Sequence, residues 1–247
     1  MLVAFGMIGT SLSGVTFVSV PGGVGSGNFY YFQIVLGYLL GYAVIAFVLI
    51  PLYYRMNLTS IYTYLEKRLG VSAHKAGAFF FILSRTVGAT ARLYLVINIL
   101  QLFILDELGI PFIVTTFVIL LMILLYTFEG GVKTIIYTDT LQTSGMLIGL
   151  VVCIIVIVKA MGTDFSGVLS TMTDRGYTKI FNTDIKAGSF FAKHIVGGMF
   201  IAIAMTGLDQ EMKKKNISVK TLKDSQKNIM TFSAVLVVVN LLFLVLG

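Results

Sequence analysis

Charge, cysteine and tryptophan are all scarce in this sequence. Only 12% of the 247 residues are charged and none is tryptophan, whereas an ordinary soluble domain carries about 25% charged residues. Cys153 is the single cysteine, so the chain can form neither an internal disulfide nor a zinc cluster. No HExxH, GxSxG or CxxC pattern occurs. These deficits exclude a secreted disulfide scaffold and leave an enzyme without support.

Apolar residues make up 57% of the chain, and its mean hydropathy is +0.94. A helix that crosses a bilayer needs about 20 mostly apolar residues. Seven stretches meet that requirement: 1–21, 29–53, 76–105, 110–128, 134–161, 187–208 and 229–247. The sequence therefore predicts an all-α integral membrane protein whose solvent is the lipid bilayer.

Lysine and arginine are concentrated in alternate connections between these stretches. The basic connections are 54–75, 129–133 and 209–228, which the positive-inside rule places in the cytoplasm. The connections 22–28, 106–109 and 162–186 then face outward. Because the basic residues sort by side of the membrane, the net charge of +7 indicates orientation rather than nucleic-acid binding.

Both ends of the sequence are apolar. The chain begins inside one expected span and stops at Gly247, at the end of another, with no hydrophilic tail at either end. We therefore expect a piece of a longer protein. No organelle signal is present, so we expect the inner membrane of a bacterial cell as its location.

The middle of the first span is a poor lipid-facing helix. Hydroxyl residues stand at 10, 11, 13, 16 and 19, beside Gly9 and Gly14, and such residues favour non-helical backbone. Unwound carbonyls there can coordinate a cation, while a close helix–helix contact through small residues explains the pattern equally well. The span 187–208 is also interrupted, at Gly197-Gly198 and Thr206-Gly207. Two interrupted spans are typical of a transporter's central site.

Four charged side chains lie in or near the spans. Arg85 and Arg92 are seven residues apart, on one face of the third span. A mid-membrane arginine needs a partner, so Arg92 is either half of a structural ion pair or a fixed cation for an anionic solute. Asp139 near the cytoplasmic mouth either pairs with a basic group or guides a departing cation. Lys193, with His194 beside it, is expected at the outer interface. Gly37 and Gly41 form a GxxxG pattern that predicts a packing face.

Four patterns follow one another along the chain. They are SLSGVTFVSVPG at 11–22, IPLYYR with TSIY and YLEKR within 50–68, GG with YTD and Q within 130–142, and GLDQ with its lysine-rich continuation at 207–227. Together they cover most of residues 1–247 and resemble the sodium/solute symporter family of proline, pantothenate, sugar and iodide carriers. Tyr137 stands where that family usually has tryptophan.

The resemblance implies a LeuT-like bundle of two inverted five-helix repeats. The chain would be a single transmembrane transporter domain, 1–247, with the first repeat at about 1–161 and the start of the second at about 187–247. It would hold core helices one to seven and lack the extra helix that usually precedes the core. Core helix eight, whose hydroxyls normally complete the ion site, would also be missing.

The resemblance further implies where ligands bind. Main-chain carbonyls of Gly14 and Phe17 correspond to the family's Na+ ligands, and Asp139 corresponds to its ion-exit acid. We expect the solute site to include Ser13, Thr16, Arg92 and Thr206. Sodium is thus the expected coupling ion, although proton coupling stays open at this point.

The expected function is sodium-coupled symport of a small organic solute by alternating access. Ala202 and Met205 stand where related sugar carriers have asparagine and tyrosine, so a sugar would lose its partners. Arg92 favours an anionic or carboxylate-bearing solute. Two alternatives remain open on the sequence: a transporter-like sensor module of a signalling protein, and a transport-incompetent fragment. The identity of the solute and the oligomeric state are open as well.

Overall fold

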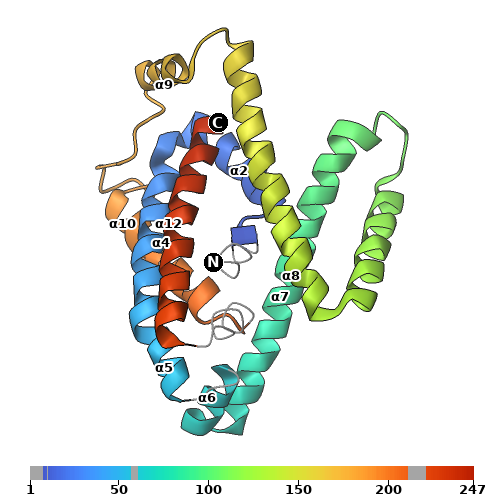
Figure 1. Ribbon diagram of the computed structural model, residues 1–247, viewed down its shortest axis with the longest axis vertical. Coiled ribbons are helices and arrows are strands. Elements are labelled where there is room, and N and C mark those ends of the chain that lie inside the picture. The colour runs from blue at the N-terminus through green and yellow to red at the C-terminus, as the bar shows by residue number, and fades with distance from the viewer. Residues whose placement is uncertain (1–7, 10, 57–60, 211–220) are drawn as a thin grey trace. The chain divides into compact units, whose positions relative to one another are not determined.

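The computed structural model describes residues 8–9, 11–56, 61–210 and 221–247. Within these residues all regular secondary structure is helical (Figure 1), which confirms the predicted fold class. The chain divides into two compact units, one made of 1–58 with 142–247 and the other of 59–141. The start of the first expected span and most of the lysine-rich segment, 211–220, lie outside the described residues. The organisation into two inverted repeats stays a prediction.

The described helices of the first unit follow one another in chain order. They are α2 (Gly14–Gly22), α3 (Val24–Gly27), η1 (Asn28–Tyr30), α4 (Tyr31–Val44), η2 (Ile45–Leu49), α5 (Ile50–Arg55), α9 (Phe165–Asp174), α10 (Phe191–Ala202), η4 (Ile203–Gly207) and α12 (Leu222–Leu246). The second unit contains α6 (Ile61–Leu69), α7 (Val71–Leu100) and η3 (Gln101–Leu105). α8 (Phe112–Ala160) begins in the second unit and ends in the first.

Glycines bring α4 and α10 into close contact. A Cβ atom placed on Gly198 of α10 would overlap the backbone of Ile34, and one on Gly37 would overlap the backbone of Ile195. A Cβ on Gly41 would also overlap α10, at 2.6 Å from the Met199 carbonyl oxygen and the Ala202 Cβ. Because only glycine lacks a Cβ, these positions allow the two backbones to touch. The packing role predicted for Gly37 and Gly41 is confirmed.

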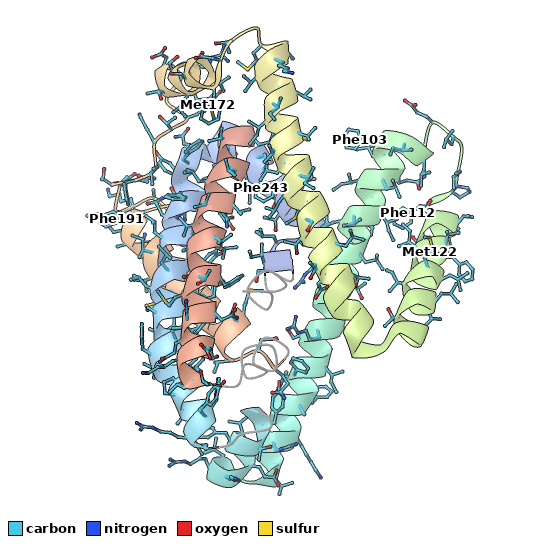
Figure 2. All side chains as sticks on the ribbon, in the orientation of Figure 1. Phe103, Phe112, Met122, Met172, Phe191 and Phe243 are labelled. Carbon is cyan, nitrogen blue, oxygen red and sulfur yellow. The ribbon has the colours of Figure 1, made fainter. Side chains whose placement is uncertain are left out.

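α12 supplies much of the core of the first unit and lies beside α4 (Figure 1). It begins where the Thr221 hydroxyl accepts the Asp224 N–H (3.1 Å), a side-chain N-cap. Its buried apolar residues recur every three or four positions: Ile229, Phe232, Leu236, Val239 and Phe243. This spacing keeps them on one helical face. Phe243, labelled in Figure 2, is fully buried and contacts the ring of Phe17 edge-on, with 5.4 Å between ring centroids.

Four helices in the described part of the chain are long and apolar enough to cross a membrane, judged by length and composition. They are Val24–Arg55, Val71–Leu105, Thr138–Ala160 and Leu222–Leu246, and each corresponds to an expected span. Two other expected spans, 110–128 and 187–208, are represented by the shorter apolar helices Phe112–Leu125 and Phe191–Gly207. The first expected span is divided by a break in its helix.

Large apolar side chains are exposed along the helices of the second unit. Phe103 is 72% exposed and Met122 is 63% exposed (Figure 2). Soluble monomers rarely present long rows of such residues to water. These surfaces therefore favour contact with lipid, as the composition predicted.

Candidate functional site

The first span is broken at Leu12 and Ser13. Both residues are non-helical, and Ser13 has extended dihedral angles (φ −120°, ψ 167°) before α2 begins at Gly14. The Ser13 N–H donates to Thr16 Oγ1 (3.3 Å), whereas an uninterrupted helix would pair that N–H with the Gly9 carbonyl. The unwound backbone predicted for this span is confirmed.

The break places the start of α2 at this point of the chain. α2 begins with N–H groups, which carry partial positive charge, so negative charge is favoured there. The Gly9 carbonyl does not receive the Ser13 N–H that an uninterrupted helix would supply, and main-chain carbonyls at such a break favour a cation. Gly14 and Phe17 lie in the first turns of α2, after the break. Their assignment as Na+ ligands stays a prediction.

A cavity of about 500 Å³ lies beside α2, a size typical of small-molecule sites. Most of its polar lining consists of hydroxyl groups, together with an amide and an imidazole. The polar side chains around it are Thr16, Ser19, Ser26, Asn28, Tyr30, Tyr31, Ser189 and His194. None of the cavity's lining residues is acidic or carries a permanent positive charge. Thr16 therefore belongs both to the break and to the wall of this cavity.

Gln33 of α4 connects the walls of the cavity, and sequence reasoning missed it. The side chain is fully buried. Its Nε2 donates to the carbonyls of Tyr30 (3.0 Å) and Ser189 (3.2 Å), and its Oε1 accepts the N–H of Asn182 (3.3 Å). Its Nε2 also lies 3.4 Å from His194 Nδ1. The lone glutamine of an otherwise apolar span was the signal available in the sequence.

Lys193 and His194, expected together at the outer interface, have different surroundings. Lys193 is exposed, and its Nζ donates to the carbonyls of Ile185 (2.9 Å) and Ala187 (3.2 Å). The half-buried His194 turns instead to the cavity and to Gln33. The polar network around Gln33, rather than the membrane surface, thus accounts for the histidine.

The second interruption lies at the end of α10, where η4 is π-helical. The Tyr53 hydroxyl donates to the Gly207 carbonyl (2.7 Å). A π-turn shifts carbonyls out of the i→i−4 pattern, and the Tyr53 side chain of α5 bonds to the turn. Thr206, expected in the solute site, is buried there, with 5% of its surface exposed. Its role as a solute ligand stays a prediction.

The structure brings Ser13 and Thr16 together at the break and holds Thr206 in η4. Arg92 is exposed on α7, and Asp139 is half-buried on α8, both in the second unit. Arg85 lies over the ring of Phe81, with its guanidinium carbon 5.6 Å from the ring centroid. The grouping of Arg92 and Asp139 with the broken span stays a prediction.

Comparison with known proteins identifies the relatives of this chain. The model of the sodium:solute symporter family matches residues 1–247. The chain is similar to the sodium/sialic acid symporter of Aliivibrio fischeri, with 22% identity over 98% of this chain and 48% of that protein. It is similar to the sodium-dependent multivitamin transporter of Oryctolagus cuniculus (27% identity, 90% and 34%) and to the human sodium/iodide cotransporter (26% identity, 91% and 34%). The chain thus spans about half the length of the sialic acid symporter. It spans about a third of the length of the other two relatives.

One solved structure has the same fold. It is the substrate-bound, outward-open state of a Na+-coupled sialic acid symporter. The TM-score is 0.85 at 23% identity, and the match covers 100% of this chain and 52% of the other. The fold is therefore LeuT-like, and this chain corresponds to about half of it.

Proposed function

The chain belongs to the sodium:solute symporter family, and from that premise we propose that the protein couples the inward movement of Na+ to the uptake of a small organic solute. The observation that carries the proposal is the helix break at Leu12 and Ser13. Main-chain groups at a break within the membrane supply binding sites for ions and charged solutes without any metal-binding side chain.

In this proposal the transported Na+ binds to main-chain carbonyls at the break and in the first turns of α2. The family resemblance assigns the carbonyls of Gly14 and Phe17. We add the carbonyl of Gly9, because the Ser13 N–H that would pair with it in an uninterrupted helix donates to Thr16. Asp139 then lies on the route by which the ion reaches the cytoplasm.

The solute we propose is anionic. The start of α2 favours negative charge, and Arg92 supplies a full positive charge. Ser13, Thr16 and Thr206 complete the proposed set with hydroxyl groups. Two of the similar proteins are named for sialic acid and iodide, which are anions at neutral pH. Ala202 and Met205 supply no hydrogen bonds to sugar hydroxyls.

Coupling follows from shared stabilisation of one conformation. If Na+ and solute both favour the outward-open state, each raises the affinity for the other by the same factor. The membrane potential adds about 2.3 kcal/mol per charge for each 100 mV. The close glycine contacts between α4 and α10 let these helices move as one body, which suits alternating access.

This proposal makes the protein a transporter and not an enzyme, located in the cytoplasmic membrane. The relatives are named as transporters, and the apolar helices are those of a multi-pass membrane protein. For a bacterial source this is the inner membrane. A small-molecule solute, Na+ and lipid are its proposed partners.

Uptake into proteoliposomes tests the role of Arg92. With an inward Na+ gradient and a panel of labelled carboxylates and sugars, we expect uptake of a carboxylate that choline does not support. Arg92→Gln should raise the half-saturating concentration at least about tenfold, because a hydrogen bond to a charged group contributes roughly 1.5–3 kcal/mol. Arg85→Gln, on the same helix, is the control and should leave the value near wild type. Equal kinetics for wild type and Arg92→Gln would remove Arg92 from the solute site.

A further inference from the structure

α6 and the start of α7 form a packed helical hairpin that the proposed transport does not use. The ring of Tyr62 contacts Phe81 (5.8 Å between centroids) and His74 (6.3 Å). Gly77 allows α7 to approach α6, because a Cβ there would lie 3.0 Å from the side chains of Leu65 and Tyr62. These contacts give the hairpin a fixed shape within its own unit.

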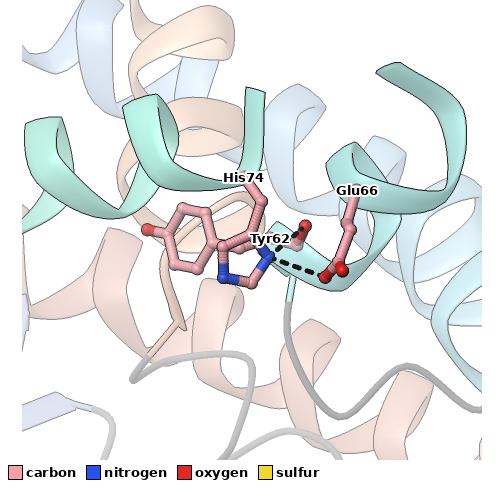
Figure 3. Close-up of polar contacts among 3 residues, drawn as sticks. All are labelled: Tyr62, Glu66 and His74. Atoms are coloured by element: carbon pink, nitrogen blue, oxygen red, sulfur yellow. Dashed lines mark hydrogen bonds and ion pairs between the residues drawn. The ribbon is translucent and has the colours of Figure 1, made fainter. Parts of the chain in front are cut away.

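The acidic residue of the hairpin, Glu66, pairs with His74. His74 Nδ1 lies 3.1 Å from Glu66 Oε2 and 3.2 Å from the Tyr62 carbonyl (Figure 3). Both neighbours accept hydrogen bonds, so Nδ1 carries the proton and donates to them. Glu66 is the one acid between residues 61 and 77. Its carboxylate is directed to His74, and within the described hairpin Lys67, Arg68 and Lys75 form no ion pair with it.

The tip of the hairpin exposes apolar and basic side chains together. Leu69 is 71% exposed and Val71 is 56% exposed, on either side of Gly70, whose φ of +91° makes the tight turn. Lys67, Arg68 and Lys75 are exposed around them. Apolar side chains flanked by cations are typical of segments that bind at the surface of an anionic membrane.

We propose that this tip is a docking surface for the anionic lipid headgroups of the inner leaflet. The charge pattern of the sequence places residues 54–75 on the cytoplasmic side. If the apolar part of α7 enters the hydrocarbon at Ala76, Val71 lies about 7.5 Å away along the helix, within the headgroup layer. Leu69 and Val71 then contact the acyl boundary, while the three basic side chains contact lipid phosphates.

A fluorescent reporter beside the tip tests this directly. Ser72 is exposed, so the protein carries Ser72→Cys in a Cys153→Ser background and is labelled there with an NBD dye. We expect the emission to shift to the blue, and quenching by aqueous iodide to fall, when phosphatidylglycerol is added to phosphatidylcholine nanodiscs. High salt should reverse the change, because it screens surface charge.

Two triple variants, each losing three positive charges, identify the site. Lys67→Gln/Arg68→Gln/Lys75→Gln should abolish the response to phosphatidylglycerol. The matched control changes three exposed basic residues expected on the other side of the membrane: Lys159→Gln/Arg175→Gln/Lys179→Gln. It should keep the response. Circular dichroism and a single size-exclusion peak confirm that each variant is folded.

Three results would overturn the proposal. One is the same emission in neutral and anionic nanodiscs. Another is a response that persists in the hairpin variant, and the third is a response lost equally in both triple variants, which would indicate total charge rather than this surface. The test uses no transported solute, so its failure is distinct from failure of the proposed transport.

Discussion

Replacing Gly198 by alanine is expected to force α4 and α10 apart. The added Cβ would overlap the Ile34 carbonyl oxygen and lie 3.0 Å from its carbon and 3.1 Å from the Ile34 Cα. These are main-chain atoms, so no side-chain rotation relieves the contact. One helix has to move, and the reciprocal contact at Gly37 moves with it.

The size of the effect follows from two opposing contributions. Overpacking that shifts backbone destabilises a protein by about 1–3 kcal/mol. Alanine also favours a helix over glycine by about 0.5–1 kcal/mol. Gly197 supplies the second contribution alone, because a Cβ there meets nothing within 4 Å. Both variants gain the helix contribution, so they should differ by roughly 1–3 kcal/mol, the overpacking contribution alone.

The assay is thermal unfolding of the protein in detergent, with Gly197→Ala and Gly198→Ala measured side by side. For a chain of this size 1 kcal/mol moves the midpoint by about 2–4 °C. Gly198→Ala should then unfold at least about 2 °C below Gly197→Ala. Gly197→Ala itself should match or exceed wild type. Equal midpoints for the two variants would refute the close contact between α4 and α10.

Three further changes probe the site. Tyr53→Phe removes the donor to the buried Gly207 carbonyl and should lower stability by about 1–3 kcal/mol in the same assay; an unchanged midpoint argues against the bond. Gln33→Leu leaves its half-buried main-chain partners at Asn182 and Ser189 unsatisfied, so hydrogen exchange across 182–189 should accelerate, and wild-type protection there would contradict that role. Asp139→Asn should slow Na+-driven uptake without changing the Na+ concentration for half-maximal stabilisation, whereas a shifted concentration would make Asp139 an ion ligand.

The helix breaks could be predicted because their causes are local. Hydroxyl and glycine residues around Ser13 compete with helical hydrogen bonds within a few positions, and the structure breaks the helix there. The interruption before Leu208 was likewise predicted, although the structure resolves it as a π-turn rather than an unwound segment. The interruption expected at Gly197-Gly198 was wrong, because both glycines lie in regular α-helix and Gly198 serves instead for close packing against α4.

Other parts of the site depend on contacts that no local pattern contains. The partners of Gln33 are Asn182, Ser189 and His194, which lie 149 to 161 residues away in the chain. The bond from Tyr53 to Gly207 joins residues 154 positions apart. Periodicity and composition describe which face of a helix is apolar, but they do not determine which buried polar group meets which carbonyl. The cavity wall and the Tyr53 side chain that bonds to η4 therefore required the structure.

The most direct test of sodium-coupled binding is the thermal stability of the purified protein in NaCl and in choline chloride at equal ionic strength, with and without a carboxylate solute. A ligand that binds only the folded state raises its stability by RT ln(1 + [L]/Kd). The account predicts a midpoint that rises with Na+ concentration, and a further rise with the solute that is larger in Na+ than in choline. Identical midpoints in the two salts, with the solute effect also the same in both, would contradict it.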